Sequence, residues 1–348
     1  MFFPGSNSDP LARLQLGFAG AGGCTTPHLS VDGMTEAGPN LSHWPGNRTP
    51  PEWKADLSTG IALRFANAAP ERQDEFLGDA QLVVNDHYDT DGFGALLAVL
   101  RPDVARKHEE LLLAAAATGD FGVMTTWRGF AIDRIVRELV GERSPVRGAF
   151  TEFAGEGPDR LALERYRWLL EHCDSVLGRI GGYRDIYEQE LRLVQQQIDG
   201  GLRGAFDVRH LPASALSVVT SDGELHRMTL NTLARAWRVL HVMRSPDGVR
   251  YRYHDRTESW FELVTLQPPP RRDLRELAKA LEELEPERDG ASWNADPPTT
   301  PIPELYFGVP SEQEYGAITR ELRPSALAPE RVAEAFASFL ATGDSRPR

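Results

Sequence analysis

The sequence predicts an α/β protein in which helices flank a parallel sheet, followed by a smaller α+β domain. A short apolar run over residues 82–84 leads through a polar turn into an apolar helix, the handover expected in a parallel α/β sheet. Helical spacing dominates up to about residue 205, and alternating strand patterns follow. We therefore expect four parts: an irregular N-terminal arm or covering loop over 1–58, an α/β domain over 59–205, a smaller α+β domain over 206–310, and a C-terminal helix and tail over 311–348.

The remaining elements follow from periodicity and from the residues that end helices. Pro102 is typical of the first turn of a helix, and glycines or prolines interrupt the later helical runs. The spacing predicts a strand over 216–220, a strand over 249–254 that forms a hairpin with 258–265, and helices over 102–118, 125–142, 159–197, 228–239, 272–284 and 326–342.

Composition and charge narrow the class of protein. The 348 residues are 41% hydrophobic and 26% charged, which is typical of a soluble chain with a buried core. The net charge of −13 argues against a nucleic-acid partner and against a basic membrane-binding surface. There is no signal-peptide pattern and no apolar run long enough to span a membrane. We expect a cytoplasmic protein, and the bias toward Ala, Arg, Gly and Pro indicates a bacterium with GC-rich DNA.

The polar turn between residues 85 and 92 carries the most specific chemistry. Four side chains that can bind metal occur within six residues: Asp86, His87, Asp89 and Asp91. Carboxylates this close repel one another unless a cation neutralises them. Imidazole and carboxylate ligands suit Mn, Fe or Zn, and mostly oxygen ligands suit Mg or Mn, so we expect a divalent metal with Mn as first candidate. The alternative is an acidic turn without metal, because Asp also bonds its own backbone in turns.

Two familiar acidic motifs do not fit this turn. A calcium loop that begins at His87 would need a Glu at its twelfth position, where the chain has Ala98. A haloacid-dehalogenase-like phosphatase has Asp-x-Asp directly after its apolar strand, whereas Asp89-Thr-Asp91 follows four polar or aromatic residues, 85–88. We expect Gly92 to let the backbone turn sharply into the helix, whose N-terminus would help hold an anion.

The run His87-Tyr-Asp89-Thr-Asp91-Gly92 resembles the first motif, His-x-Asp-x-Asp-Gly, of the DHH phosphoesterase superfamily. The resemblance implies that His87 and Asp89 bind one Mn-like ion, that Asp91 binds a second, and that a second domain supplies substrate contacts. The run Ala115–Gly122 looks like a small-residue-Gly-Asp turn of the same superfamily, which makes Asp120 a further candidate ligand. The alternative for Asp120 is a turn residue at the end of a helix. The later Asp-His-His of the superfamily is not matched, because the chain contains no His-His pair.

Two other segments are candidates for binding an anionic substrate. Residues 41–51 gather Ser, His, Trp, Asn and Arg between prolines, and there His43 and Arg48 would face the anion. The alternative is a covering loop anchored by Trp44. In the predicted strand 249–254, alternation places Arg250, Arg252 and His254 on one face. That row is either an anion clamp or a solvated face balanced by local acids.

These features lead us to expect a metal-dependent hydrolase acting on a phosphate ester or similar anionic small molecule. The alternatives are a non-catalytic ligand-binding or interaction protein derived from such a fold, and a metal-dependent enzyme of another reaction class. The candidate metal ligands are His87, Asp89, Asp91 and Asp120; the candidate catalytic residues are Asp86, His87 and Asp120; and the candidate substrate-binding residues are His43, Arg48, Arg250, Arg252 and His254.

Overall fold

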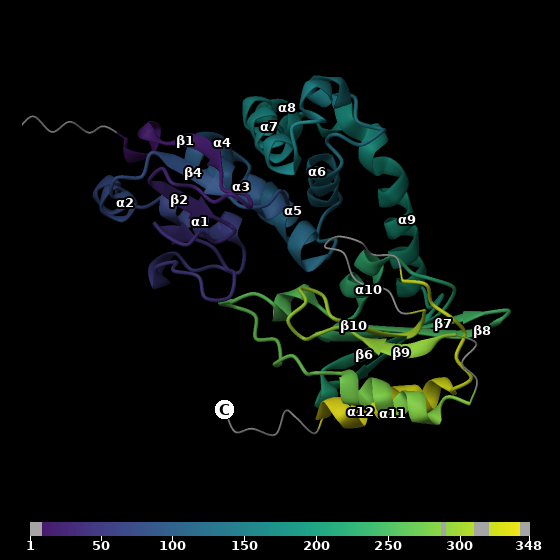
Figure 1. Cartoon of the computed structure of the whole chain (residues 1–348). Helices are drawn as coiled ribbons and strands as arrows, with labels where there is room; N and C mark the ends of the chain where they lie inside the picture. The colour runs from purple at the N-terminus through teal and green to yellow at the C-terminus, as the bar shows by residue number, and fades with distance from the viewer. Residues whose placement is uncertain (1–8, 287–289, 310–319, 342–348) are drawn as a thin grey trace, which may run out of the picture. The chain divides into compact units, whose positions relative to one another are not determined.

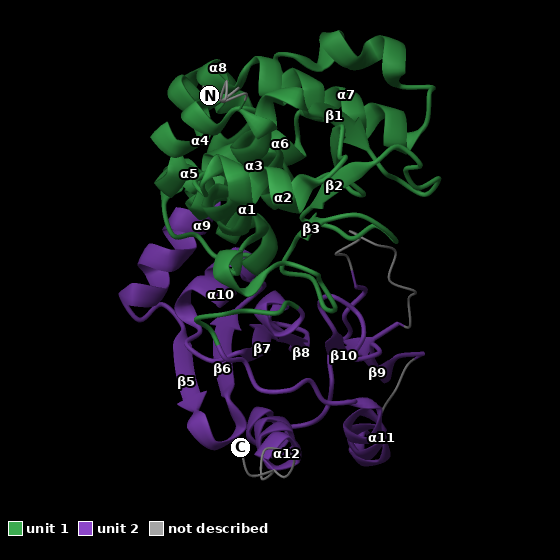
Figure 2. Ribbon diagram, turned by 90° about the vertical axis from the view of Figure 1, so that its left-hand side faces the viewer, with its two compact units in different colours: residues 1–192, 261–266 green, residues 193–260, 267–348 purple. Residues whose placement is uncertain are grey.

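The computed structural model describes residues 9–286, 290–309 and 320–341, and it divides the chain into two compact units (Figure 2). The first unit comprises residues 1–192 and 261–266, and the second comprises 193–260 and 267–348. The boundary therefore falls at residue 192, inside helix α9 (Arg184–Leu202), rather than at residue 205 as the sequence predicts. Within the described ranges, no helix combines the length and the apolar character needed to cross a membrane.

A four-stranded parallel sheet lies at the centre of the first unit, which confirms the predicted sheet. Its strands are β1 (Gln15–Phe18), β4 (Leu82–Asn85), β2 (His28–Val31) and β3 (Asn40–Leu41), in that spatial order. The prediction of an irregular arm over residues 1–58 was wrong, because β1, β2 and β3 all come from it. Each of these strands has only two to four residues between glycines and prolines, too few for alternation to be visible in the sequence.

Helices surround this sheet, and the apolar helix predicted after the acidic turn is confirmed as α3 (Thr90–Leu100) (Figure 1). Residues Phe93, Leu96 and Leu97 of α3 are fully buried, since α3 packs against the strands on one side and against α1 and α5 on others. The other helices of this unit are α1 (Ser58–Ala66), α2 (Pro70–Leu77), α4 (Pro102–Lys107), α5 (Glu109–Phe121), α6 (Trp127–Arg137), α7 (Pro158–Glu171) and α8 (Cys173–Gly178), with the start of α9.

The second unit is built on a six-stranded mixed sheet, in agreement with the predicted α+β character. Its spatial order is β5 (Asp207–Leu211), β6 (Leu216–Asp222), β7 (Arg238–Ser245), β8 (Gly248–Asp255), β10 (Glu304–Gly308) and β9 (Ser292–Ala295). Strands β6 and β7 run parallel, and the other neighbours are antiparallel. Helices α11 (Arg275–Leu284) and α12 (Pro329–Ala341) cover one face, and α10 (Arg227–Leu233) covers part of the other (Figure 1).

The predicted hairpin of residues 249–254 with 258–265 was wrong. The hairpin partner of β8 is β7, whose first two residues the sequence assigns to the end of a helix. An apolar run such as Val239–Met243 fits a buried strand or a buried helix equally well by periodicity. The predicted alternation does hold, because Tyr251 and Tyr253 lie in the core beneath α11 and α12. Residues 261–266 are not a strand and belong to the first unit.

Candidate metal centre

The acidic turn after β4 is held by two side chains that are not themselves candidate ligands. The Asn85 side-chain oxygen accepts a hydrogen bond from the Asp86 amide at 2.7 Å. The buried Tyr166 hydroxyl accepts one from the Asp89 amide at 3.0 Å and donates to the His87 carbonyl at 3.0 Å. Because Asn85 also donates to the Tyr166 hydroxyl at 3.2 Å, the turn has one conformation in which its ligating side chains converge.

Gly92 is required by this packing rather than by a sharp turn, which corrects the reason given from the sequence. The residue lies inside helix α3, and it is not among the glycines with positive φ. A Cβ at this position would lie 2.0 Å from the Asn85 side-chain nitrogen and 2.5 Å from the Tyr166 hydroxyl. Asp89 caps the N-terminus of this helix, because its Oδ1 accepts a hydrogen bond from the Gly92 amide at 2.8 Å. Its Oδ2 faces the cluster.

The structure brings six candidate metal ligands together in two groups that share one residue. The first group, here the open half-site, consists of Asp32, His87 and Asp89. In it the His87 Nε2 lies 3.4 Å from Asp32 Oδ2 and 3.3 Å from Asp89 Oδ2. The side chains of His87 and Asp89 are 20% and 31% exposed, so solvent reaches this half-site.

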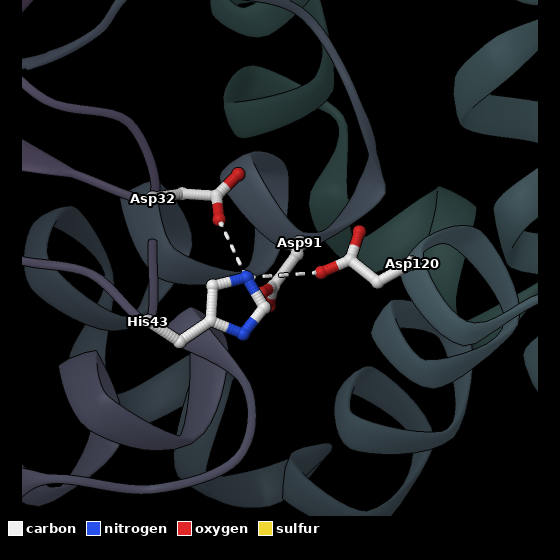
Figure 3. Close-up of side chains that lie close together, drawn as sticks. All are labelled: Asp32, His43, Asp91 and Asp120. Atoms are coloured by element: carbon white, nitrogen blue, oxygen red, sulfur yellow. Dashed lines mark ion pairs between the residues drawn. The ribbon is translucent and has the colours of Figure 1, made fainter. Parts of the chain in front are cut away.

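The second group, here the buried half-site, consists of Asp32, His43, Asp91 and Asp120 (Figure 3). Its centre is the Nε2 atom of His43, which lies 3.3 Å from Asp120 Oδ2. The same nitrogen lies 3.6 Å from Asp91 Oδ2 and 3.7 Å from Asp32 Oδ1. The side chain of Asp120 is 7% exposed and the other three are at most 1% exposed, so this half-site is closed to bulk solvent.

Asp32 joins the two half-sites, because its Oδ1 faces His43 and its Oδ2 faces His87. It follows β2 directly and has a left-handed backbone with φ of 58°. Among the described residues, Ala215 is the other non-glycine residue with positive φ. A strained backbone of this kind is typical of functional sites, where the position of the side chain matters more than local stability.

Both histidines present the same ring nitrogen to the carboxylates. The His43 Nδ1–H donates to the Asp56 carbonyl at 2.7 Å, and His87 Nδ1 lies 2.7 Å from Asp86 Oδ1. With Nδ1 held in this way, Nε2 carries the lone pair that a metal ion needs. Asp86 is itself fixed by the Met34 amide at 3.0 Å. It therefore orients His87, and its predicted catalytic role stays a prediction.

The last two carboxylates are supplied by helices α3 and α5. Asp91 accepts hydrogen bonds from the Ser58 and Thr59 amides, both at 2.7 Å, at the N-terminus of α1. Asp120 lies in the last turn of α5, where the partial negative charge of the helix end disfavours a carboxylate. A buried acid at that position is stabilised by a nearby cation.

The pKa values of the cluster reflect crowded negative charge. Burial and the charges of Asp89 and Asp91 raise the pKa of Asp32 well above its ordinary value. Burial and Asp91 do the same to the pKa of Asp120. Burial lowers the pKa of His87, but Asp89, Asp32 and Asp86 outweigh it and raise that pKa well above the usual range. Without a cation, the carboxylates of the cluster cannot all ionise together.

The unpaired atoms of the cluster fit a metal ion. Both oxygens of Asp32, Nε2 of His43 and Oδ2 of Asp120 are buried without a hydrogen-bond partner in the part of the chain that the structure describes. Buried polar atoms are ordinarily paired, so four unpaired atoms that face the two half-sites indicate missing partners. All of them can donate electron pairs to a cation, and a mixed set of imidazole nitrogen and carboxylate oxygen suits Mn, Fe or Zn.

The sequence identified part of this cluster. The four predicted metal ligands, His87, Asp89, Asp91 and Asp120, come together in the structure. His43, predicted to bind an anionic substrate, faces three carboxylates instead, where an anion would be repelled. Asp32 was missed altogether, although the run Leu29-Ser-Val-Asp32-Gly33 is a short strand followed by a turn pair. The structure also explains why the second residue of this pair is a glycine. A Cβ at Gly33 would lie 2.0 Å from the Asp86 carboxylate.

The other predicted substrate-binding residues lie outside the cluster, each with partners of its own. The Arg48 guanidinium donates to the carbonyls of Thr35 and Gly38. The remaining three belong to the second unit, where Arg250 pairs with Asp247, Arg252 pairs with Glu224, and the His254 ring bonds Asn231. The arrangement of Arg250 and Arg252 matches the alternative of a strand face balanced by local acids.

The fold and the cluster together define an α/β protein with a buried group of aspartates and histidines that can hold a metal ion. The chain belongs to the family of unknown function DUF6687, which matches it over residues 16–347. Comparison with curated proteins and with solved structures returned no match. The function of this family is not known, so function has to be argued from the site itself.

Proposed function

We propose that this protein is a metal-dependent hydrolase of phosphate esters or similar anionic small molecules, with two divalent ions bridged by Asp32. The observation that carries the proposal is the position of Asp32, whose two oxygens each face a different histidine and its neighbouring carboxylates. Paired divalent ions in such a site lower the pKa of a bound water and neutralise negative charge on the substrate. Mn²⁺ is the first candidate, with Mg²⁺, Fe²⁺ and Zn²⁺ as further candidates.

The charge of the cluster supports two ions rather than one. The two half-sites together contain four carboxylates: Asp32, Asp89, Asp91 and Asp120. Two divalent cations balance four carboxylates, whereas a single divalent cation leaves an excess of negative charge in a buried site. The neutral imidazoles of His43 and His87 add one nitrogen ligand to each ion without changing this balance.

The difference in exposure supports distinct roles for the two half-sites. His43 and Asp91 are fully buried, so the ion beside them would hold the bridging Asp32 in place. The partly exposed His87 and Asp89 would hold the ion that water and substrate reach. The half-buried Trp44, whose ring centroid lies 5.1 Å from that of His87, forms part of the wall there.

A relationship to the DHH superfamily is part of the proposal, with an altered order along the chain. In support of it, His87 and Asp89 lie in one half-site and Asp91 lies in the other. The additional candidates Asp32 and His43 follow β2 and β3, and so precede the motif, whereas the Asp-His-His of the superfamily comes after it.

The test measures metal content and hydrolysis on the same samples. The purified protein is loaded with Mn²⁺, desalted and analysed for metal, and it is then assayed with p-nitrophenyl phosphate and bis(p-nitrophenyl) phosphate. The Asp89→Asn/Asp91→Asn double variant removes one carboxylate from each half-site, and Asp174→Asn, at an exposed carboxylate, is the matched control. We expect about two ions per chain and hydrolysis in the wild type and in the control, and neither in the double variant.

Two outcomes would contradict the proposal in different ways. If the protein binds no metal after loading, the cluster is not a metal centre and the acidic turn has only a structural role. Two bound ions without hydrolysis of any phosphate ester would favour the non-catalytic binding protein or an enzyme of another reaction class.

A further inference from the structure

Residues 261–266, here the return segment, belong to the first unit, although the residues before and after them along the chain belong to the second. The chain leaves the second unit after Trp260, forms part of the first unit over these six residues, and rejoins the second unit at Gln267. The return segment was expected to be a strand, so its contacts with the first unit had no signal in the sequence. Those contacts concentrate on the loop that carries His43.

The first contact is an aromatic stack on the metal-facing imidazole. The rings of Phe261 and His43 have centroids 3.9 Å apart and planes inclined by 17°. Phe261, Leu263 and Leu266 pack against the buried cluster of Leu57, Ala116 and Phe121. One face of the His43 ring is therefore covered by a side chain of the return segment, which restricts rotation of the ring.

The second set of contacts fixes the backbone on both sides of that ring. The Glu262 amide donates to the His43 carbonyl at 2.8 Å, and its carboxylate accepts from the Gly46 amide and the Asn47 side chain, both at 2.8 Å. The Val264 and Thr265 amides donate to the Asp56 carboxylate at 2.6 and 2.8 Å. Asp56 is also the residue whose carbonyl holds His43 Nδ1, so the return segment fixes the orienting partner of His43.

We propose that the return segment is a positioning element of the metal centre, with Phe261 holding His43 in the orientation in which Nε2 faces the carboxylates. The open half-site has no equivalent dependence, because Asp86 of the first unit orients His87. Binding of the ion in the buried half-site would thus depend on a segment of the first unit that is far from His43 along the chain. This inference rests on the proposed two-metal centre.

The test compares the binding of the two ions in variants of the return segment. Phe261→Ala removes the stack, Phe261→Tyr restores a ring, and Val264→Ala changes a side chain of the same segment that is 48% exposed. Metal is measured by equilibrium dialysis with Mn²⁺ and by electron paramagnetic resonance, which separates a coupled Mn pair from a single Mn ion. We expect Phe261→Ala to bind one ion at least about 10-fold more weakly and to give the single-ion spectrum. The tyrosine variant and the Val264 control should keep the coupled pair.

Two results would overturn the inference while leaving the proposed function in place. One is a folded Phe261→Ala protein, judged by circular dichroism, that binds both ions with wild-type affinity. The other is an equal loss of affinity for both ions. If Phe261→Ala does not fold, Glu262→Gln provides the same test. It removes the negative charge that accepts hydrogen bonds from residues 46, 47 and 54, so it should reduce the affinity for the same single ion. A wild-type protein without metal would instead contradict the proposed function.

Discussion

A pair of histidines lies in a polar cluster in each unit, and the charges around the two pairs are opposite. In the first unit, His43 and His87 face the carboxylates of Asp32, Asp89, Asp91 and Asp120. In the second unit, His241 and His254 are buried beside arginines, and their rings bond Ser221 and Asn231. Burial and Arg252 lower the pKa of His241 to about 3, whereas the surrounding carboxylates raise the pKa of His87 well above its ordinary value.

This difference shows that the neighbours of a buried histidine decide what it can do. A neutral imidazole bonded to a hydroxyl or an amide is satisfied and contributes to packing. An imidazole whose second nitrogen faces several buried carboxylates is satisfied by a cation. The four predictions below separate the two clusters, in order of decreasing expected effect.

The largest effect is expected from removing the shared carboxylate. Asp32→Asn should lose both ions and reduce hydrolysis at least about 100-fold, because each half-site loses an anionic ligand. The matched variant in the second unit is Glu304→Gln, a buried carboxylate beside Arg320 and Arg252. It should keep both ions while costing about 1–2 kcal/mol of stability, since Arg320 and Arg252 keep their ion pairs with Asp296 and Glu224. Elemental analysis measures the metal content of both variants, and urea unfolding measures their stability. Loss of metal in Glu304→Gln would contradict the assignment of metal binding to the first cluster alone.

Metal removal should destabilise the first unit alone. At a free Mn²⁺ concentration 100 times the dissociation constant, binding adds about 2.7 kcal/mol per ion to the free energy of unfolding. For a unit of this size, that corresponds to an increase of about 5–10 °C in its melting temperature. Differential scanning calorimetry with Mn²⁺ and with EDTA should show one transition that moves and one that does not. Equal shifts of both transitions, or no shift, would contradict the assignment of the ions to the first unit.

Acid should destabilise the second unit through its histidines. The folded-state pKa of His241 is about 3 and the ordinary value is 6.5, so the unfolded chain takes up the proton first as the pH falls. The stability that His241 contributes is therefore complete above pH 6.5 and is lost between pH 6.5 and 3, at about 2 kcal/mol between pH 7 and 5. His241→Gln cannot titrate and should lose correspondingly less stability over that range. Urea unfolding at pH 7 and 5 gives the comparison, and identical losses in both proteins would refute it.

The smallest effect is expected from the tyrosine hydroxyls. Tyr166→Phe removes the group that fixes the acidic turn, and Tyr251→Phe removes a buried hydroxyl that donates to the Leu327 carbonyl in the second unit. Each should cost about 1–2 kcal/mol of stability. Only Tyr166→Phe should also weaken metal binding at the open half-site, by about 10-fold, because its turn carries His87 and Asp89. Equal metal affinities in the two variants would show that the turn does not depend on Tyr166.

The parts of the site predicted from the sequence are those whose residues are close along the chain. The strand β4, the acidic turn and α3 follow one another over residues 82–100, so the apolar runs and the density of carboxylates identify them together. Asp120 was recognised from its own short run of small residues. In each case the residues that identify the element are neighbours along the chain, and the element forms in the structure as those residues predict.

The parts that were missed depend on contacts between distant segments. Asp32 and His43 follow strands of four and two residues, and they reach the acidic turn through the parallel order β1-β4-β2-β3. That order is not encoded in any single segment. The return segment was missed for the same reason, since Phe261 meets His43 across more than 200 residues of chain. Its own pattern resembles a strand, and the residues that determine its position lie far away along the chain.

The central claim is that Asp32 bridges two metal ions, and the most direct test is anomalous X-ray diffraction from crystals grown with Mn²⁺. The account predicts two anomalous peaks, one beside His87 and Asp89 and the other beside His43, Asp91 and Asp120, with one oxygen of Asp32 at each. Crystals without an anomalous peak in this cluster, or with peaks elsewhere and Asp32 unliganded, would contradict it.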